Sequence, residues 1–144
     1  PGPIRRREVG ALLTEDLATT YDPIFKVNPP LRSAADVEAV RAGLADGTID
    51  IVGTDHAPHP MEDKECEWAV AAFGMLGLEQ ALSVVMDTMV RSGRLDWPDV
   101  ARVMSQTPAR IGRRPDHGRP LAAGEPANLV LVAPDSRGIV DPSR

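Results

Sequence analysis

Segments typical of β-strands alternate with segments typical of capped helices along this chain, and this alternation limits the folds open to it. Runs of mostly β-branched or aromatic residues at 24–27 and 49–54 predict two strands. Between them, Ser33 and Asp36 have the spacing of a helix capping box, and Gly47 predicts the end of that helix. Residues 77–91 predict a second helix, apolar on most faces and therefore buried between other elements. Strands that alternate with helices in this way indicate parallel βα units and an α/β fold.

The second half of the chain predicts further helices, followed by an irregular linker and a short pair of strands. A helix is expected from Asp96 through Met104, and a short one from Thr107 to Ile111. Residues 112–126 are rich in Arg, Pro and Gly, which predicts an irregular linker. Residues 128–132 predict a strand, with 138–140 as its partner. Only two βα units precede residue 112, too few to close an eight-stranded barrel of ~250 residues.

Composition excludes several classes of protein. The 144 residues carry a net charge of −5, and the only basic cluster is Arg5-Arg6-Arg7, so we predict no nucleic-acid partner. The longest apolar run falls short of the ~18–20 residues that span a bilayer, so we predict no membrane segment. A single cysteine, Cys66, cannot form an intrachain disulfide and fits a reducing compartment. We expect a cytoplasmic protein.

Asp55 is the first candidate for chemistry, because it follows the predicted strand at 49–54. Parallel α/β folds place functional side chains at the carboxyl ends of strands. A carboxylate there can bind a metal, act as a general base, or form an Asx-turn with the following loop. His56 and His59 lie within four residues of it and offer metal-ligand atoms, a proton shuttle or a donor to an anion. Each histidine is also compatible with an ordinary loop residue, and His117 is interpreted as solvated.

Asn28 is the second candidate, because it ends the predicted strand at 24–27 and is followed by two prolines. Its amide is either a rigid donor and acceptor for a ligand or a simple turn residue. Arg32 nearby would attract an anionic substrate or would pair with Asp36. Phe73-Gly74 precedes the predicted helix at 77–91 and offers either free backbone N–H groups, which favour anions, or an ordinary helix start.

Four sequence blocks in the same order and spacing resemble the dihydroorotases, which are metal-dependent hydrolases of the amidohydrolase superfamily. The likeness covers roughly residues 12–132 and is strongest to the bacterial type I branch. The blocks are Lys26–Arg32 (KVNPPLR), Asp46–Asp50 (DGTID), Thr54–His59 (TDHAPH), and Phe73-Gly74 with Gly77–Glu79.

The resemblance implies the C-terminal part of a TIM-type (β/α)8 barrel, with the last two βα units, the following helices and a short C-terminal β segment. Residues 1–112 would form part of a metal-dependent hydrolase barrel, and residues 113–144 a linker and a β-strand segment. The implied activity is the reversible hydrolysis of (S)-dihydroorotate to N-carbamoyl-L-aspartate in pyrimidine (UMP) biosynthesis.

The resemblance also implies roles for particular residues. Asp55 matches the aspartate that ligates zinc and serves as catalytic acid and base. His59 and Asn28 match positions that contact the substrate, and Phe73 and Gly74 match a loop that contacts it through backbone groups. The implied cofactor is Zn²⁺, with one or two ions in the complete enzyme.

The chain departs from the family pattern in its metal ligands. The family's His-x-His pair and its other ligands would precede residue 1, and Val9-Gly10 stands where two histidines are usual. Asp55 is thus the only matched ligand, whereas zinc takes about four. Because the chain begins with Pro1 and stops after a strand-like run, we expect a piece of a longer protein that holds no zinc and is inactive by itself.

Two alternative functions remain. One is another cyclic amide hydrolase, such as an allantoinase or a dihydropyrimidinase. The other is a non-catalytic dihydroorotase-like scaffold that binds aspartate transcarbamoylase. The expected partner is a small-molecule substrate, and homo-oligomerisation or association with a transcarbamoylase is left open.

Overall fold

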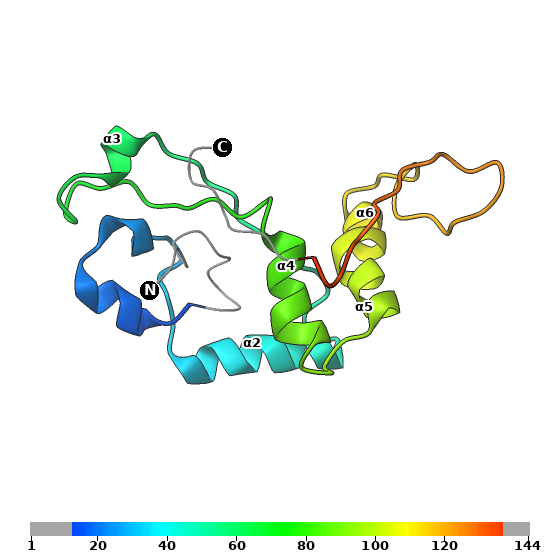
Figure 1. Ribbon diagram of the computed structural model, residues 1–144, viewed down its shortest axis with the longest axis horizontal. Helices are drawn as coiled ribbons and strands as arrows, with labels where there is room; N and C mark the ends of the chain where they lie inside the picture. The colour runs from blue at the N-terminus through cyan, green and yellow to red at the C-terminus, as the bar shows by residue number, and fades with distance from the viewer. Residues whose placement is uncertain (1–12, 137–144) are drawn as a thin grey trace.

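Helices provide almost all the regular structure of residues 13–136, which are the residues that the computed structural model describes (Figure 1). Within this range the chain forms no β-strand, and Thr14 and Arg32 make the isolated parallel bridge. The helical segments in chain order are the 3-10 helices η1 (Glu15–Thr20) and η2 (Pro23–Phe25), the α-helices α2 (Ala34–Asp46), α3 (Met61–Lys64) and α4 (Ala81–Val85), the π-helical turn η3 (Met86–Val90), α5 (Trp97–Ala101), the π-helical turn η4 (Arg102–Gln106) and α6 (Thr107–Ile111).

Helix α2 begins and ends where the sequence predicts. The Ser33 hydroxyl accepts a hydrogen bond from the Asp36 backbone N–H at 3.2 Å, and the Asp36 carboxylate accepts one from the Ser33 N–H at 3.2 Å. Gly47 follows the helix with φ +84°, a conformation that glycine adopts without steric cost. The predicted capping box is confirmed, and hydrogen bonds from Ser33 lower the pKa of Asp36 below its ordinary 3.8.

The predicted break between two C-terminal helices is wrong. The helix starts at Asp96 as expected, where Asp96 and Asp99 form a capping box, but it then continues through η4 into α6. Pro108 has no N–H for the preceding turn, and its ring crowds the carbonyl four residues earlier. The wider π-helical turn of η4 lies just before this proline, so the helix passes it without ending.

The buried helix predicted at 77–91 is confirmed, with a later start at Ala81. Its buried residues run through both α4 and η3. The backbone N–H groups of Gly77 and Leu78 are directed instead to His56 Nδ1, at 3.2 and 3.4 Å. Gly93, with φ +74°, turns the chain after the helix.

Two small apolar clusters form the core. The larger joins α2, the α4–η3 helix and the α5–η4 helix, and the most deeply buried side chains in it are Val103 and Met89. The smaller joins the N-terminal segment to the 25–31 region and Met75. The buried members are Leu44, Val85, Met89, Leu95, Val100 and Val103 in the first cluster, and Leu13, Val27 and Leu31 in the second.

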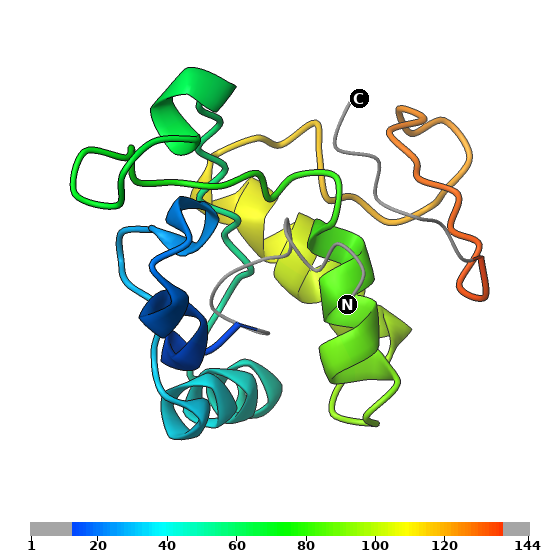
Figure 2. The same ribbon diagram turned by 60° about the vertical axis from the view of Figure 1, so that its left-hand side comes forward.

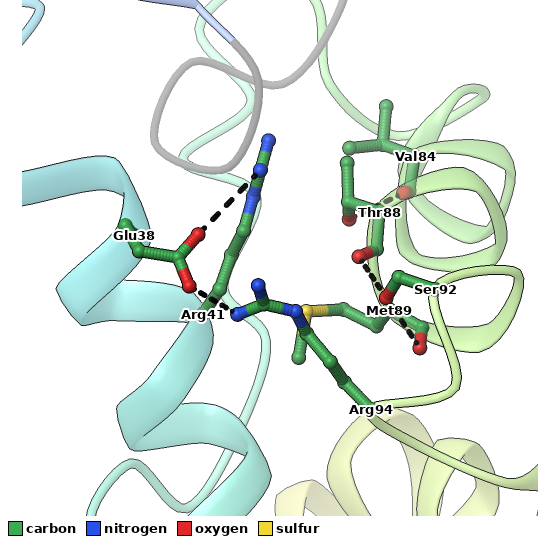
Figure 3. Close-up of polar contacts among 7 residues, drawn as sticks. All are labelled: Glu38, Arg41, Val84, Thr88, Met89, Ser92 and Arg94. Atoms are coloured by element: carbon green, nitrogen blue, oxygen red, sulfur yellow. Dashed lines mark hydrogen bonds and ion pairs between the residues drawn. The ribbon is translucent and has the colours of Figure 1, made fainter. Parts of the chain in front are cut away.

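An ion pair joins two helices of the larger cluster. Glu38 of α2 lies between Arg94, which follows η3, and Arg41 of its own helix (Figure 3). The Glu38–Arg94 distance is 2.6 Å. On the facing helix, Thr88 and Ser92 each donate to a backbone carbonyl four residues earlier, which is typical of a helix that bends. Helix α2 is thereby held against η3.

The strand predictions are wrong within the described residues. Ile24 and Phe25 belong to η2, because the Asp22 side chain accepts from the Ile24 N–H at 3.1 Å and caps that turn. Residues 49–54 and 128–132 form no ladder, and 138–140 lies outside the described residues. A strand requires a neighbour for its alternate N–H and C=O groups. The N–H groups of residues 49 and 52 bond to Gly43 and Val103 instead.

The segment 112–136 contains turns but no helix or strand, and almost all its residues are exposed. Leu131 is fully exposed in it. Ion pairs such as Arg119–Glu125, at 2.6 Å, hold the segment together locally. No helix in the described part of the chain is long and apolar enough to cross a membrane.

Acid is expected to destabilise the two capped helices. Hydrogen bonds, chiefly from Ser33 to Asp36 and from Arg102 to Asp99, lower the pKa of each carboxyl below 3.8. Their stabilisation is therefore complete above about pH 4 and is lost as the pH falls through the lowered values. We expect the midpoint of thermal unfolding, followed by circular dichroism, to fall between pH 4 and pH 2. In an Asp36→Asn/Asp99→Asn double variant this fall should be smaller, and an identical profile would contradict the assignment.

Candidate functional site

Three segments from separate parts of the chain meet at the candidate site: 26–30, 54–59 and 73–77. The Gly74 N–H donates to the Lys26 carbonyl at 3.1 Å, and the Ala57 N–H donates to the Met75 carbonyl at 3.0 Å. Residues 73–77 therefore lie between the other two segments. The chain segment after α3 leads to α4 in both ribbon views, and in Figure 1 the segment before α3 runs alongside it (Figures 1 and 2).

A cavity of about 510 Å³ opens between these segments and the helices. Asn28, Asp55, Phe73 and Gly74 all line it, so the structure brings together four of the five residues predicted for the site. Helix α2 and the α4–η3 helix contribute the mostly apolar side chains of Val40, Leu44, Val85 and Met89, together with Arg41 and Thr88. A mostly apolar cavity with a few polar groups at one side is typical of a small-molecule site.

Asp55 lies on the cavity wall with φ +46°. This left-handed conformation is uncommon outside glycine, although Asp and Asn adopt it more readily than other residues. Such backbone conformations cluster at functional sites, where surrounding contacts hold them in place. The contacts here are the Ala57–Met75 hydrogen bond on one side and the close approach of Gly77 to Thr54 on the other.

The two histidines of the TDHAPH block have different environments. His56 Nδ1 accepts from the N–H groups of Gly77 and Leu78, so its proton is on Nε2 and the ring fastens the chain before α4. His59 Nε2 lies 2.7 Å from the Phe73 carbonyl. Since a carbonyl only accepts, Nε2 of His59 is the donor and its Nδ1 is left for another partner. The structure thus favours the ordinary loop interpretation for His56 and places His59 at the Phe73 edge of the cavity.

The expectation that Phe73-Gly74 lies at a helix start is wrong, because α4 begins at Ala81. The expectation of a free N–H is also wrong for Gly74, which donates to the Lys26 carbonyl. The carbonyls of both residues have protein partners, His59 for Phe73 and Lys64 for Gly74. The partners of the Gly74 N–H and of the two carbonyls lie 10 or more positions away in the sequence, so the local sequence does not indicate these three hydrogen bonds.

The structure favours the simpler interpretations, an ion pair with Asp36 for Arg32 and a place outside the site for His117. Arg32 Nε pairs with the Asp36 carboxylate at 3.4 Å, although the side chain also borders the cavity and is 66% exposed. His117 is close to Asp116, at 3.4 Å, and lies outside the cavity.

Two further residues of the site, Lys26 and Lys64, have no role predicted from the sequence. The Lys26 ammonium donates to the carbonyls of Trp68 and Ala69, and the Lys64 ammonium donates to three carbonyls of the site. Burial, and then the charge of Lys26, lower the pKa of Lys64 below its ordinary 10.5. The sequence contains one signal that could have singled them out: they are the only lysines among its 16 Lys and Arg residues.

The described residues do not form a complete metal site. Within 13–136 no group of three or more His, Cys, Asp or Glu side chains is placed to hold a metal ion. Asp55 contributes one carboxylate to the cavity, whereas a zinc ion takes about four ligands. The donors present here do not by themselves fit zinc.

The chain belongs to the amidohydrolase family, which its residues 17–142 match. Its curated relatives include the dihydroorotase of Streptomyces coelicolor, 64% identical over 132 residues, and that of Mycobacterium tuberculosis, 58% identical over 125 residues. These alignments cover 92% and 87% of this chain but 31% and 29% of the relatives, so the chain spans about a third of their length. The predicted resemblance to dihydroorotases is confirmed.

Solved structures agree with this family. The L-hydantoinase (dihydropyrimidinase) of Arthrobacter aurescens is similar with a TM-score of 0.71 and 37% identity, covering 88% of this chain and 28% of that one. The dihydropyrimidinase of Brevibacillus agri, with a TM-score of 0.72 and 21% identity over 84% of this chain and 28% of that one, shows the fold alone. Family and structures together place the chain in a TIM-barrel-type fold.

Gly74→Ala is expected to loosen the site. At φ +143°, an added Cβ would lie 2.7 Å from the Ala57 Cβ and 2.8 Å from the Ala57 carbonyl oxygen. We expect a loss of about 1–3 kcal/mol in the free energy of unfolding, measured by urea denaturation.

Gly124→Ala is the matched control. Gly124 also has a positive φ, +88°, but a Cβ added there would meet nothing within 4 Å. Equal losses in the two variants would show that φ alone, and not the contact with Ala57, constrains Gly74.

Proposed function

We propose that this chain supplies part of a dihydroorotase, which interconverts (S)-dihydroorotate and N-carbamoyl-L-aspartate. The observation that carries the proposal is the shared cavity of Asn28, Asp55, Phe73 and Gly74. The identity of 64% to a curated dihydroorotase over 92% of the chain supports it further.

In the proposed enzyme, residues 1–112 contribute the last two βα units of the barrel and the following helices. Residues 113–144 contribute a linker and a C-terminal β segment. The small share of each relative that this chain covers supports the proposal.

We assign the proton transfers to Asp55. Hydrolysis of a cyclic amide forms a C–O bond to the carbonyl carbon and breaks the C–N bond of the ring. The attacking water must lose a proton, and the departing nitrogen must gain one. A carboxylate on the cavity wall can accept the first proton and return it to the nitrogen, acting as general base and then as general acid.

Asn28 and His59 are proposed to hold the substrate. The Asn28 amide borders the cavity and offers N–H donors to a substrate carboxylate. His59 is fixed by its Nε2 bond to Phe73, so the remaining Nδ1 can donate to the same carboxylate when the ring is protonated. Phe73 and Gly74 would close the other side of the substrate. Holding the ring in one orientation is itself a contribution to rate.

The proposed cofactor is zinc, one or two ions per enzyme, with Asp55 as one ligand. The described residues fall short of a full ligand set, so the remaining ligands would come from elsewhere in the enzyme.

The proposed setting is the cytoplasm, with a small-molecule substrate. The net charge of −5 and the single cysteine are compatible with this proposal. Self-association or association with aspartate transcarbamoylase is a further proposal, which co-purification would test. A purely scaffolding role is less well supported, because Asn28, Asp55 and His59 are all retained.

One specific observation favours a second candidate. The L-hydantoinase of Arthrobacter aurescens shares 37% identity and a TM-score of 0.71 with this chain. Hydantoins and dihydropyrimidines are also cyclic amides, but they lack the carboxylate that Asn28 and His59 are proposed to bind. Substrate preference therefore separates the two candidates.

A chimeric enzyme tests the proposal. In the Streptomyces coelicolor dihydroorotase, the matching 132-residue segment is replaced by the corresponding part of this chain. We expect the chimera to bind zinc and to hydrolyse dihydroorotate, followed by its ultraviolet absorbance, in preference to hydantoin and dihydrouracil. The isolated 144-residue chain should bind no stoichiometric zinc and show no turnover. The opposite preference would favour the second candidate, and a folded chimera without turnover would contradict both.

Replacing the Asp55 carboxylate is expected to slow turnover strongly. Asp55→Asn in the chimera should lower kcat by about 10²–10⁴-fold, because an amide cannot exchange the proton. His117→Asn, in the exposed 112–136 segment, is the control and should leave kcat unchanged. A loss of less than about threefold at Asp55 would remove it from the proton-transfer role.

A further inference from the structure

Lys26 and Lys64 hold together the segments that form one side of the site. Their ammonium groups donate to five backbone carbonyls, those of Trp68, Ala69, Lys26, Ala72 and Gly74, at distances from 2.7 to 3.1 Å. Neither ammonium has an assigned ion pair with a carboxylate of the described residues. Both charges are therefore met mainly by carbonyl dipoles, those of the 68–74 loop and of Lys26, while the Asp22 carboxylate also attracts Lys64.

Lys64 joins the two segments directly. Its Nζ lies 3.1 Å from the Lys26 carbonyl oxygen, 3.0 Å from that of Ala72 and 3.0 Å from that of Gly74. The Lys26 carbonyl also accepts the Gly74 N–H, at 3.1 Å, so one oxygen receives donors from both sides. Because an ammonium offers three donors at one point, a single side chain can hold three carbonyls from two segments.

Lys26 bonds to an earlier part of the same loop. Its side chain is buried, with 7% exposure, although it is the residue that begins the KVNPPLR block. Its Nζ donates to the Trp68 and Ala69 carbonyls and lies 4.5 Å from the centre of the Phe73 ring. Phe73 is otherwise 56% exposed, so this cation–π contact is a main restraint on its ring.

The choice of lysine is informative in this chain. Lys26 and Lys64 are its only lysines, and every other cationic side chain of this type is an arginine. Arginine presents donors in a planar fork suited to carboxylates, whereas lysine is a compact charge with three donors that spread from one atom. Three carbonyl oxygens that converge on one point suit the ammonium group of lysine better than the planar guanidinium of arginine.

We propose that Lys26 and Lys64 are positioning residues that set the place of Phe73, Gly74 and His59 against Asn28, and thereby the affinity for substrate. This proposal rests on the proposed function for its kinetic consequence. The Phe73 carbonyl orients His59, so a displaced 72–74 backbone also displaces the imidazole. The chain on either side of Asp55 contacts a later part of this segment, through the Ala57–Met75 hydrogen bond and the close approach of Gly77 to Thr54, so we expect Asp55 to move less than His59.

The positioning role is tested first without substrate, in the full 144-residue chain. We expect the Gly74 and Ala72 amides to exchange hydrogen about tenfold faster in Lys64→Met and in Lys26→Met, while the amides of α5, η4 and α6 are unchanged. Arg110→Met, which removes an exposed cation outside the site, is the control. Unchanged exchange at Gly74 in a folded Lys64→Met variant overturns the proposal.

A second measurement needs no variant and so is unaffected by misfolding. Reductive methylation followed by mass spectrometry reports on both lysines, because the chain has no others. In the native chain we expect Lys26 and Lys64 to react at least about tenfold more slowly than in the urea-unfolded chain. Equal rates in the two states would mean that the ammonium groups are free, which also overturns the proposal.

The kinetic consequence is tested in the chimeric dihydroorotase. Lys64→Met should raise KM for dihydroorotate about tenfold or more and change kcat less than about threefold. Lys64→Arg should behave like Lys64→Met, and full recovery with arginine would show that charge alone matters, against the proposal. If the unmodified chimera lacks activity, the proposed function fails while the exchange and methylation results still decide the positioning role.

Discussion

The close packing of the 73–77 backbone between two other segments is the constraint on which the candidate site depends. A Cβ at Gly74 would approach the Ala57 side chain within 2.7 Å, and one at Gly77 would approach the Thr54 carbonyl within 3.0 Å. Because no side chain intervenes, the backbone of this segment can bond to the Lys26 carbonyl on one side and to Ala57 on the other. Asn28 and Asp55, remote in sequence, consequently line the same cavity.

The parts of the molecule that support the site differ in what holds them. The helices are held by an apolar cluster with Val103 and Met89 at its centre, and by the Glu38–Arg94 ion pair. The site segments have few buried apolar side chains, and single hydrogen bonds from backbone groups and two lysines hold them instead. Their geometry therefore depends on directional contacts, each of which is sensitive to the removal of one donor.

Local features of the fold were predictable from the sequence, and long-range ones were not. The capping boxes at Ser33 and Asp96 involve residues three positions apart, so their partners are visible in the sequence. The predicted strands at 24–27 and 49–54 depend on distant neighbouring strands. Within the described residues, backbone N–H groups of these segments bond to other carbonyls instead. The gathering of Asn28, Asp55 and Phe73 followed from the resemblance to dihydroorotases, whereas Lys64 lies in none of its blocks and Lys26, although it begins one, had no predicted role.

The sequence by itself determined the α2 helix with its caps, the buried α4–η3 helix and the residues to examine, because these depend on side chains within a few positions of one another. It also identified the family, because the order and spacing of the four blocks can be read directly from the sequence. Only the tertiary structure decided that His56 fastens the chain before α4, that His59 bonds to Phe73, and that the Gly74 N–H is occupied. Each of these contacts joins residues 14 or more positions apart, and the sequence contains no local signal for which donor meets which acceptor across that distance.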